Sequence, residues 1–228
     1  MAKYNLINFE SESEFARYAA EEFNTLAEQA IAERGRFNVA LSGGRTPKPV
    51  WEALKTIPVD WSRVHIYWSD ERYVPIEHPR SNAGSAKHDL LDHVPVSKAH
   101  IHAIETGLAD PHECALRYAK NLEELRLDLV YLGIGTDGHT ASLFPGISLP
   151  VNSKVAAIYV ARQGEYRITL LPDAINQARE IRFLVSGPEK KMILEQVLQA
   201  SEDQVLYPCQ RIRSCPILAF EVFSSCSS

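Results

Sequence analysis

Hydrophobic residues recur along the chain in two patterns, which together predict strands alternating with helices. Short apolar runs, typical of buried strands, occur at residues 37–41, 64–68, 128–132, 155–160, 167–171, 181–185 and 217–222, after a first edge strand at 3–9. Apolar spacings of three and four, with start and stop signals, predict helices at residues 12–34, 47–55, 83–91, 111–125, 173–177 and 188–199. This alternation predicts an α/β fold in one domain, residues 1–228, with a doubly wound, mostly parallel, Rossmann-like sheet flanked by helices.

Local signals refine some of these elements. Gly35 is expected to end the first long helix, because glycine accepts the left-handed conformation common just past a helix end. Thr46 is a suitable N-cap and Pro47 a suitable first residue for the helix that follows. Residues 99–104 are a further candidate strand.

Polar or glycine-bearing segments follow four of the predicted strands. These segments are SGGRTP at residues 42–47, SDER at 69–72, GIGTDGH at 133–139 and SGPEK at 186–190. In open α/β sheets, ligands bind beyond the carboxyl ends of the strands, and parallel strands place these ends at one edge. The sequence therefore predicts one site built from all four segments.

The first of these segments suits an anion. Gly43 and Gly44 form a turn before a helix start, where backbone N–H groups and the helix dipole favour negative charge. Arg45 adds a cation beside Thr46. A tight turn without a ligand is the alternative, and this segment alone does not separate the two interpretations.

Charged residues of the other segments suit the same chemistry. Arg72 follows a buried aromatic strand, together with Asp70, and can bind a phosphate through two parallel hydrogen bonds. Arg167 opens a strand after a polar loop. Lys190 lies in the first turn of a helix, where a cation is unfavourable unless an anion is held nearby. Ordinary surface charges are the alternative for each residue taken singly.

The glycine-rich segment matches the GxGxxG fingerprint of dinucleotide sites, but its context argues against that function. The fingerprint requires an acidic residue about 20 positions further on, whereas none occurs between Gly138 and Gly164. Pro145 also cuts short the helix that should follow. His139 is instead a candidate general base, placed at an expected helix start whose dipole disfavours the imidazolium. Asp137 or Asp70 is available to orient His139 or the attacking water. A structural histidine is the alternative.

Composition narrows the classes of function. The net charge of −5 disfavours a general nucleic-acid binder. The N-terminus lacks the pattern of a signal peptide and no apolar run reaches about 18 residues, so we expect a cytoplasmic protein without a membrane partner. The cysteines show no CxxC pair and are expected to be reduced; they are Cys114, Cys209, Cys215 and Cys226. His100 and His102 could share a metal, but an exposed strand face is the favoured interpretation.

These segments together resemble one known family. SGGRTP, SDERYVP, SNAGSAKHDLL, DLVYLGIGTDGHTASLFPG, RITL and SGPEK, in this order, are similar to the 6-phosphogluconolactonase family, over residues 10 to 222. The related glucosamine-6-phosphate isomerases/deaminases share the fold, but typically read MDEY in place of SDER and GHIAFNEPG in place of GHTASLFPG. Both differences favour the lactonases.

The resemblance implies hydrolysis of 6-phospho-D-glucono-1,5-lactone without an organic cofactor or metal. It implies that His139 is the catalytic base and that Arg72 and Lys190 contact the substrate phosphate. Arg167 falls at another position lining the site, and Asn82 is a weaker correspondence. We expect a small phosphorylated lactone as substrate and a monomer or weak dimer. An isomerase/deaminase and a non-catalytic sugar-phosphate sensor remain the alternatives.

Overall fold

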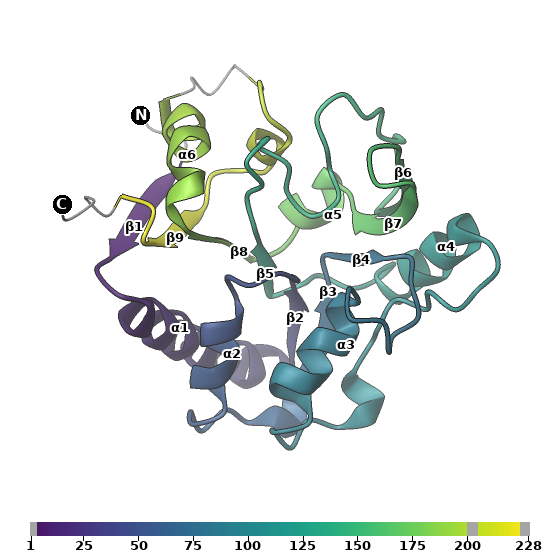
Figure 1. Ribbon diagram of the computed structural model, residues 1–228. Helices are drawn as coiled ribbons and strands as arrows, with labels where there is room; N and C mark the ends of the chain where they lie inside the picture. Colours follow the sequence, from purple (N-terminus) through teal and green to yellow (C-terminus); the bar gives the residue numbers. More distant parts are fainter. Residues whose placement is uncertain (1–3, 200–204, 224–228) are drawn as a thin grey trace.

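A computed structural model describes residues 4–199 and 205–223 of the chain (Figure 1). Its main sheet has the strand order β1-β9-β8-β5-β2-β3, and every neighbouring pair is parallel. These strands are β1 (Asn5–Phe9), β2 (Phe37–Leu41), β3 (Val64–Trp68), β5 (Leu129–Leu132), β8 (Glu180–Ser186) and β9 (Pro216–Phe220). The predicted parallel α/β sheet is confirmed.

Helices cover both faces of this sheet, as a doubly wound fold requires. They are α1 (Glu12–Arg34), α2 (Lys48–Leu54), α3 (Asn82–Ala86), α4 (Pro111–Asn121), α5 (Pro172–Asn176) and α6 (Lys191–Gln199). In Figure 1, α1, α2 and α3 lie on one side of the sheet, and α5 and α6 lie on the other. Strands β2 and β5 are buried along their whole length, which explains their uninterrupted apolar sequences.

Helix α1 has the boundaries that its sequence predicts. The side chain of Ser11 accepts a hydrogen bond from the backbone N–H of Glu14 and so caps the first turn. Gly35 adopts a left-handed conformation with φ of 75°, and its N–H donates to the carbonyl of Ile31. The apolar side chains spaced along the helix are buried against the sheet; they include Phe15, Ala19, Phe23, Ala27 and Ala30.

A second, smaller sheet was not predicted. Strands β4 (Asp70–Arg72), β7 (Glu165–Leu170) and β6 (Val155–Val160) form an antiparallel sheet in that order. Ser69 joins the two sheets, because its N–H donates to Leu41 of β2 at 2.8 Å and its carbonyl accepts from Leu170 of β7 at 2.8 Å. Asp70 and Arg72 therefore lie in a paired strand, and helix α4 packs on β6 and β7.

Four other local predictions need correction. Residues 98–100 form a 3₁₀ turn, and the candidate strand at 99–104 is reduced to a single bridge between Ile101 and Ile66. The helix predicted at 111–125 ends at Asn121, where the chain leaves helical geometry as Leu122 enters the core. The helix predicted at 83–91 is present, and only its type is corrected, because α3 is followed by a π-helical turn over residues 87–91.

The fourth correction concerns the start of α2. Pro47 is the N-cap, and the Thr46 hydroxyl lies 2.7 Å from the Ser186 hydroxyl instead of capping the helix. A tertiary partner has therefore replaced the local one. Three of the cysteines, Cys114, Cys209 and Cys215, are buried, and Cys226 lies outside the described residues. In residues 4–199 and 205–223, none of the helices has the length and apolarity needed to cross a bilayer.

Candidate active site

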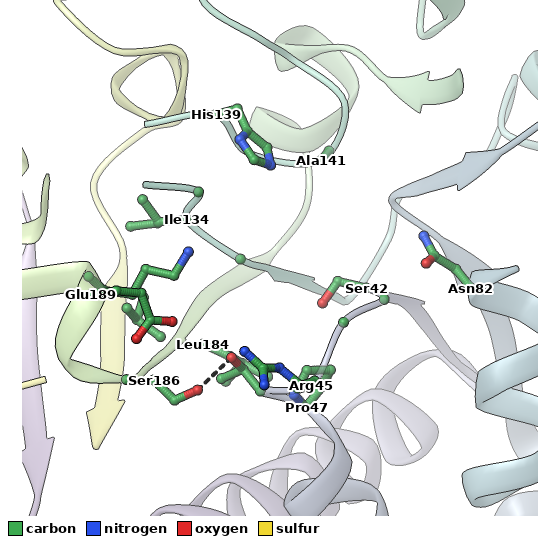
Figure 2. A pocket seen from close by; sticks show the side chains of 18 of the residues that line it. Ser42, Arg45, Pro47, Asn82, Ile134, His139, Ala141, Leu184, Ser186 and Glu189 are labelled. Carbon is green, nitrogen blue, oxygen red and sulfur yellow. Dashed lines mark hydrogen bonds between the residues drawn. The ribbon is translucent and has the colours of Figure 1, made fainter. Parts of the chain in front are cut away.

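The four polar segments converge on one cavity at the carboxyl edge of the main sheet, with a volume of about 520 Å³. Nine of the ten predicted site residues line it: Gly43, Gly44, Arg45, Thr46, Asp70, Arg72, His139, Arg167 and Lys190. Figure 2 shows the His139 ring pointing into the cavity from one side, with Arg45 and Ser186 on the opposite side. The tenth residue, Asp137, is outside the lining and contacts the ring of His139.

A tight turn presents His139. The N–H of Gly135 donates to the carbonyl of His139 at 2.8 Å, and the N–H of Gly138 donates to Gly135 at 2.9 Å. The chain then forms an isolated bridge between Thr140 and Leu143 instead of the expected helix. The prediction that a helix dipole acts on His139 is therefore wrong, because Gly138 takes φ of +77° and turns the chain away from helical geometry.

The glycines of this turn allow close packing within the protein. A Cβ at Gly135 would overlap the His139 ring, so only glycine lets the ring lie over the turn. Tyr207 packs against Gly138, at a distance that would leave no room for a Cβ. The last two glycines of the GxGxxG pattern thus reflect the space needed by His139 and Tyr207.

Asp137 holds the His139 side chain. Its Oδ1 lies 2.5 Å from Nδ1 of His139 and also accepts the His139 backbone N–H, while Oδ2 accepts from Arg162 at 2.8 Å. Burial alone would raise the pKa of Asp137, but the hydrogen bonds and charge of His139, together with the hydrogen bond from Arg162, lower it to about 2. The carboxylate is therefore ionised at neutral pH, which keeps the proton on Nδ1 and leaves Nε2 as an acceptor.

Asp70 has a different environment. Its Oδ2 accepts from the Ser142 hydroxyl at 2.6 Å, and its Oδ1 accepts from Asn82 Nδ2 at 3.1 Å. Asn82 in turn is buried against Gly43, where a Cβ would overlap its amide. Glu71 anchors this arrangement by accepting the backbone N–H of Asn82 at 2.7 Å. Asp70 and Asn82 thus form a rigid part of the cavity wall, whereas Asp137 is the carboxylate that contacts His139.

Two arginines lie side by side on neighbouring strands of the small sheet. Arg72 of β4 is paired in register with Arg167 of β7. Nη1 of Arg72 donates to the carbonyl of Arg80, and Arg167 forms an ion pair with Glu165. Within the described part of the chain, Nε of each arginine is buried without a hydrogen-bond partner. Two buried donors beside a cavity require an acceptor, which an anionic ligand would supply.

Charge repulsion and burial of the cations that line the cavity likewise indicate an anionic ligand. The pKa of Arg167 is lowered, first by burial and then by the charge of Arg72. The pKa of Lys190 is lowered by burial and by Arg45, against the opposing effects of Glu189 and Asp137. An anion that enters the cavity would relieve both effects.

Several residues of this site were not predicted from the sequence. Ser142 and Ser186 bind other site residues, and Arg162 reaches Asp137 from the turn between β6 and β7. The periodicity of the two strands indicates that turn, but no sequence signal shows that it folds back on residue 137.

His100 and His102 also lie in a different environment from the predicted one. His100 and His102 stack with His65, at ring centroid distances of 3.9 and 5.4 Å from it, rather than forming an exposed strand face. Among residues 4–199 and 205–223, none of the groups of His, Cys, Asp and Glu has an arrangement that could hold a metal ion.

Comparisons with known proteins agree with this geometry. The family model described as glucosamine-6-phosphate isomerases/6-phosphogluconolactonase matches residues 10–218. The chain is 40% identical over 195 residues to a 6-phosphogluconolactonase of Synechocystis sp., covering 81% of each chain. It is 38% identical to the Nostoc sp. 6-phosphogluconolactonase over 83% of this chain and 82% of the relative. The crystal structure of 6-phosphogluconolactonase from Thermotoga maritima has a TM-score of 0.86 at 27% identity, covering 96% of this chain and 100% of that one.

Proposed function

We propose that this chain, which belongs to the glucosamine-6-phosphate isomerase/6-phosphogluconolactonase family, hydrolyses 6-phospho-D-glucono-1,5-lactone to 6-phosphogluconate. This is the second step of the oxidative pentose phosphate pathway. The observation that carries the proposal is the cavity itself, which is lined by a histidine held by an ionised carboxylate and by a group of cations, of which Arg167 is buried and Arg72 and Lys190 are partly buried. We further propose that the enzyme acts in the cytoplasm, as a monomer or weak dimer.

The cations bind the substrate phosphate in this proposal. Arg72 and Arg167 offer buried donors, and Lys190 adds a partly buried ammonium group. The backbone of Gly43 and Gly44, with Arg45 and Thr46, lines the same cavity. A phosphate held there fixes the lactone ring and lets binding energy position its C1 carbonyl next to the imidazole.

His139 then acts as general base and general acid. Nε2 accepts a proton from a water molecule as the water oxygen forms a bond to C1 and the carbonyl oxygen becomes an oxyanion. The N–H groups of Gly135 and Gly138 donate within their own turn, so the oxyanion donors lie elsewhere. The bond between C1 and the ring oxygen then breaks, and the protonated imidazole gives its proton to the departing oxygen. Asp137 stabilises the imidazolium in between.

This chemistry needs no covalent intermediate. Gluconolactones hydrolyse spontaneously. A general base that raises the rate by a factor of about 10² to 10⁴, together with substrate positioning, is therefore sufficient. Ser42 lines the cavity but lies in an SGG turn, outside the GxSxG context of a nucleophilic serine.

The test is the hydrolysis of freshly prepared 6-phosphogluconolactone, followed by pH-stat titration. His139→Ala should lower kcat by at least about 10²-fold without unfolding the protein. His88→Ala is the control, because this histidine side chain is 88% exposed on the π-helical turn. Near-normal turnover by His139→Ala would remove this residue from the mechanism. Release of ammonia from glucosamine 6-phosphate would instead favour the isomerase/deaminase activity.

A further inference from the structure

Asp137 divides its two carboxylate oxygens between two partners. Oδ1 contacts Nδ1 of His139 at 2.5 Å, and Oδ2 accepts from Nη1 of Arg162 at 2.8 Å. Arg162 lies in the turn between β6 and β7, so it approaches the catalytic turn from the small sheet. The carboxylate is thus clamped from both sides by groups of separate elements.

The Phe144 ring contacts both His139 and Arg162. Its ring centroid lies 4.6 Å from that of His139, and the guanidinium carbon of Arg162 lies 4.6 Å from the same ring centroid. A guanidinium over an aromatic face is favourable, so Phe144 holds Arg162 in place although its side chain is 53% exposed. The same aromatic ring limits the tilt of the imidazole.

We propose that Arg162 is a positioning residue for the reaction: it fixes the orientation of Asp137 and balances its charge, so that the imidazole of His139 stays a neutral base. This inference rests on the proposed function for its kinetic consequences, but not for its structural ones. Without the Arg162 charge, the full negative charge of Asp137 would act on the ring and favour the imidazolium, which cannot accept a proton from water.

The other charged groups near the ring act from different directions. Those that contact His139 or share its cavity are Asp137, Asp70, Arg45, Arg72, Arg167, Glu12, Glu189, Glu221 and Lys190. None of them donates to Asp137 Oδ2 among the interactions of the described residues, whereas Arg162 does so directly. Removing Arg162 therefore changes one defined contact of the carboxylate.

The kinetic experiment compares Arg162→Gln with Arg162→Lys. Arg162→Gln should lower kcat about tenfold, the worth of one charge-assisted hydrogen bond that is partly exposed. KM should stay within about twofold, because Arg162 is outside the phosphate site. The acid limb of the kcat profile should move to higher pH by roughly half a unit. Arg162→Lys keeps the charge and should restore most of both effects.

Arg117→Gln is the matched control. The Arg117 side chain is 52% exposed and is paired with Glu113 at 2.6 Å on α4, remote from the cavity. It should leave kcat and the pH profile unchanged. If Arg162→Gln behaves like this control, or lowers stability without moving the pH profile, the proposal is overturned.

A second readout does not depend on lactone hydrolysis. The imidazole nitrogens of ¹⁵N-labelled protein, assigned to His139 by their loss in His139→Gln, report the tautomer and titration of the ring. Wild type should show the proton on Nδ1, and Arg162→Gln should titrate at higher pH by roughly half a unit. An unshifted titration refutes the role of Arg162, even if the wild-type protein proves inactive toward the lactone. In that case the proposed function fails separately.

Discussion

Gly135→Ala is the most direct test of the catalytic geometry. A Cβ at this position would lie 2.0 Å from Nδ1 of His139, 2.1 Å from its Cε1 and 2.8 Å from Oδ1 of Asp137. The neighbours of the methyl group are thus the ring that accepts the proton and the carboxylate that orients it. The substitution displaces both without removing a polar atom.

The size of the displacement follows from these distances. Ordinary contact begins at about 3.4 Å, so the ring must move by about 1.4 Å from a Cβ at 2.0 Å. A movement of about 1 Å at a reacting group can cost about 10²-fold in rate. The moving atoms belong to the end of a flexible side chain, so the free energy of unfolding should fall by less than about 1 kcal/mol. We therefore expect a folded protein with kcat lowered about 10²-fold.

The assay is pH-stat hydrolysis of fresh phosphogluconolactone, with urea unfolding measured on the same preparation. Gly107→Ala is the control, because a Cβ there meets no heavy atom within 4 Å and this glycine does not line the cavity. Its kcat should stay within about threefold of wild type. If Gly135→Ala also keeps its kcat within about threefold, then the orientation of the His139 ring over this glycine is not the catalytic one. A collapse of stability would show that the turn itself cannot adjust.

Two further predictions concern the pH dependence of stability and the binding of the substrate phosphate. Burial lowers the pKa of His65 to about 4, with smaller contributions from the charges of His100, His102 and Arg36. Between pH 6.5 and 4 the unfolded chain therefore binds a proton that the folded chain does not. The free energy of unfolding should fall by roughly 1 kcal/mol as the pH drops through this range. Urea unfolding across this range should show a shallower slope for His65→Gln, and an unchanged slope would contradict the assignment. Lys190→Gln should raise KM for the phosphorylated lactone by about 10- to 100-fold. It should leave kcat/KM for unphosphorylated gluconolactone unchanged, and equal losses on the two substrates would exclude a phosphate contact.

The main sheet and the cavity were predictable because each depends on short-range information. A buried parallel strand is a short apolar run, as in residues 37–41, and the chain direction then determines which end carries the site. The residues of SGGRTP, GIGTDGH and SGPEK could be placed at that edge without knowledge of any pairing.

The parts that the sequence did not predict depend on partners far along the chain. Thr46 has the properties of an N-cap, but Ser186 binds its hydroxyl, and that partner lies 140 positions away. Strand β4 has only three residues, DER, with no apolar alternation, and becomes a strand because β7 is beside it. No sequence pattern indicated that His65 stacks with His100 and His102, because these residues come together only when the loop is folded.

The pairing of β4 with β7 has a consequence for assembly. Arg72 and Arg167 are 95 positions apart and become neighbours only through this pairing. Closing a loop of that length costs chain entropy before any contact is gained, and pairings of such separation slow folding relative to local structure. Affinity for a phosphorylated ligand therefore reports on a long-range assembly step, which helix content does not measure. During refolding, the recovery of ligand binding therefore measures a different step from the recovery of the helical signal.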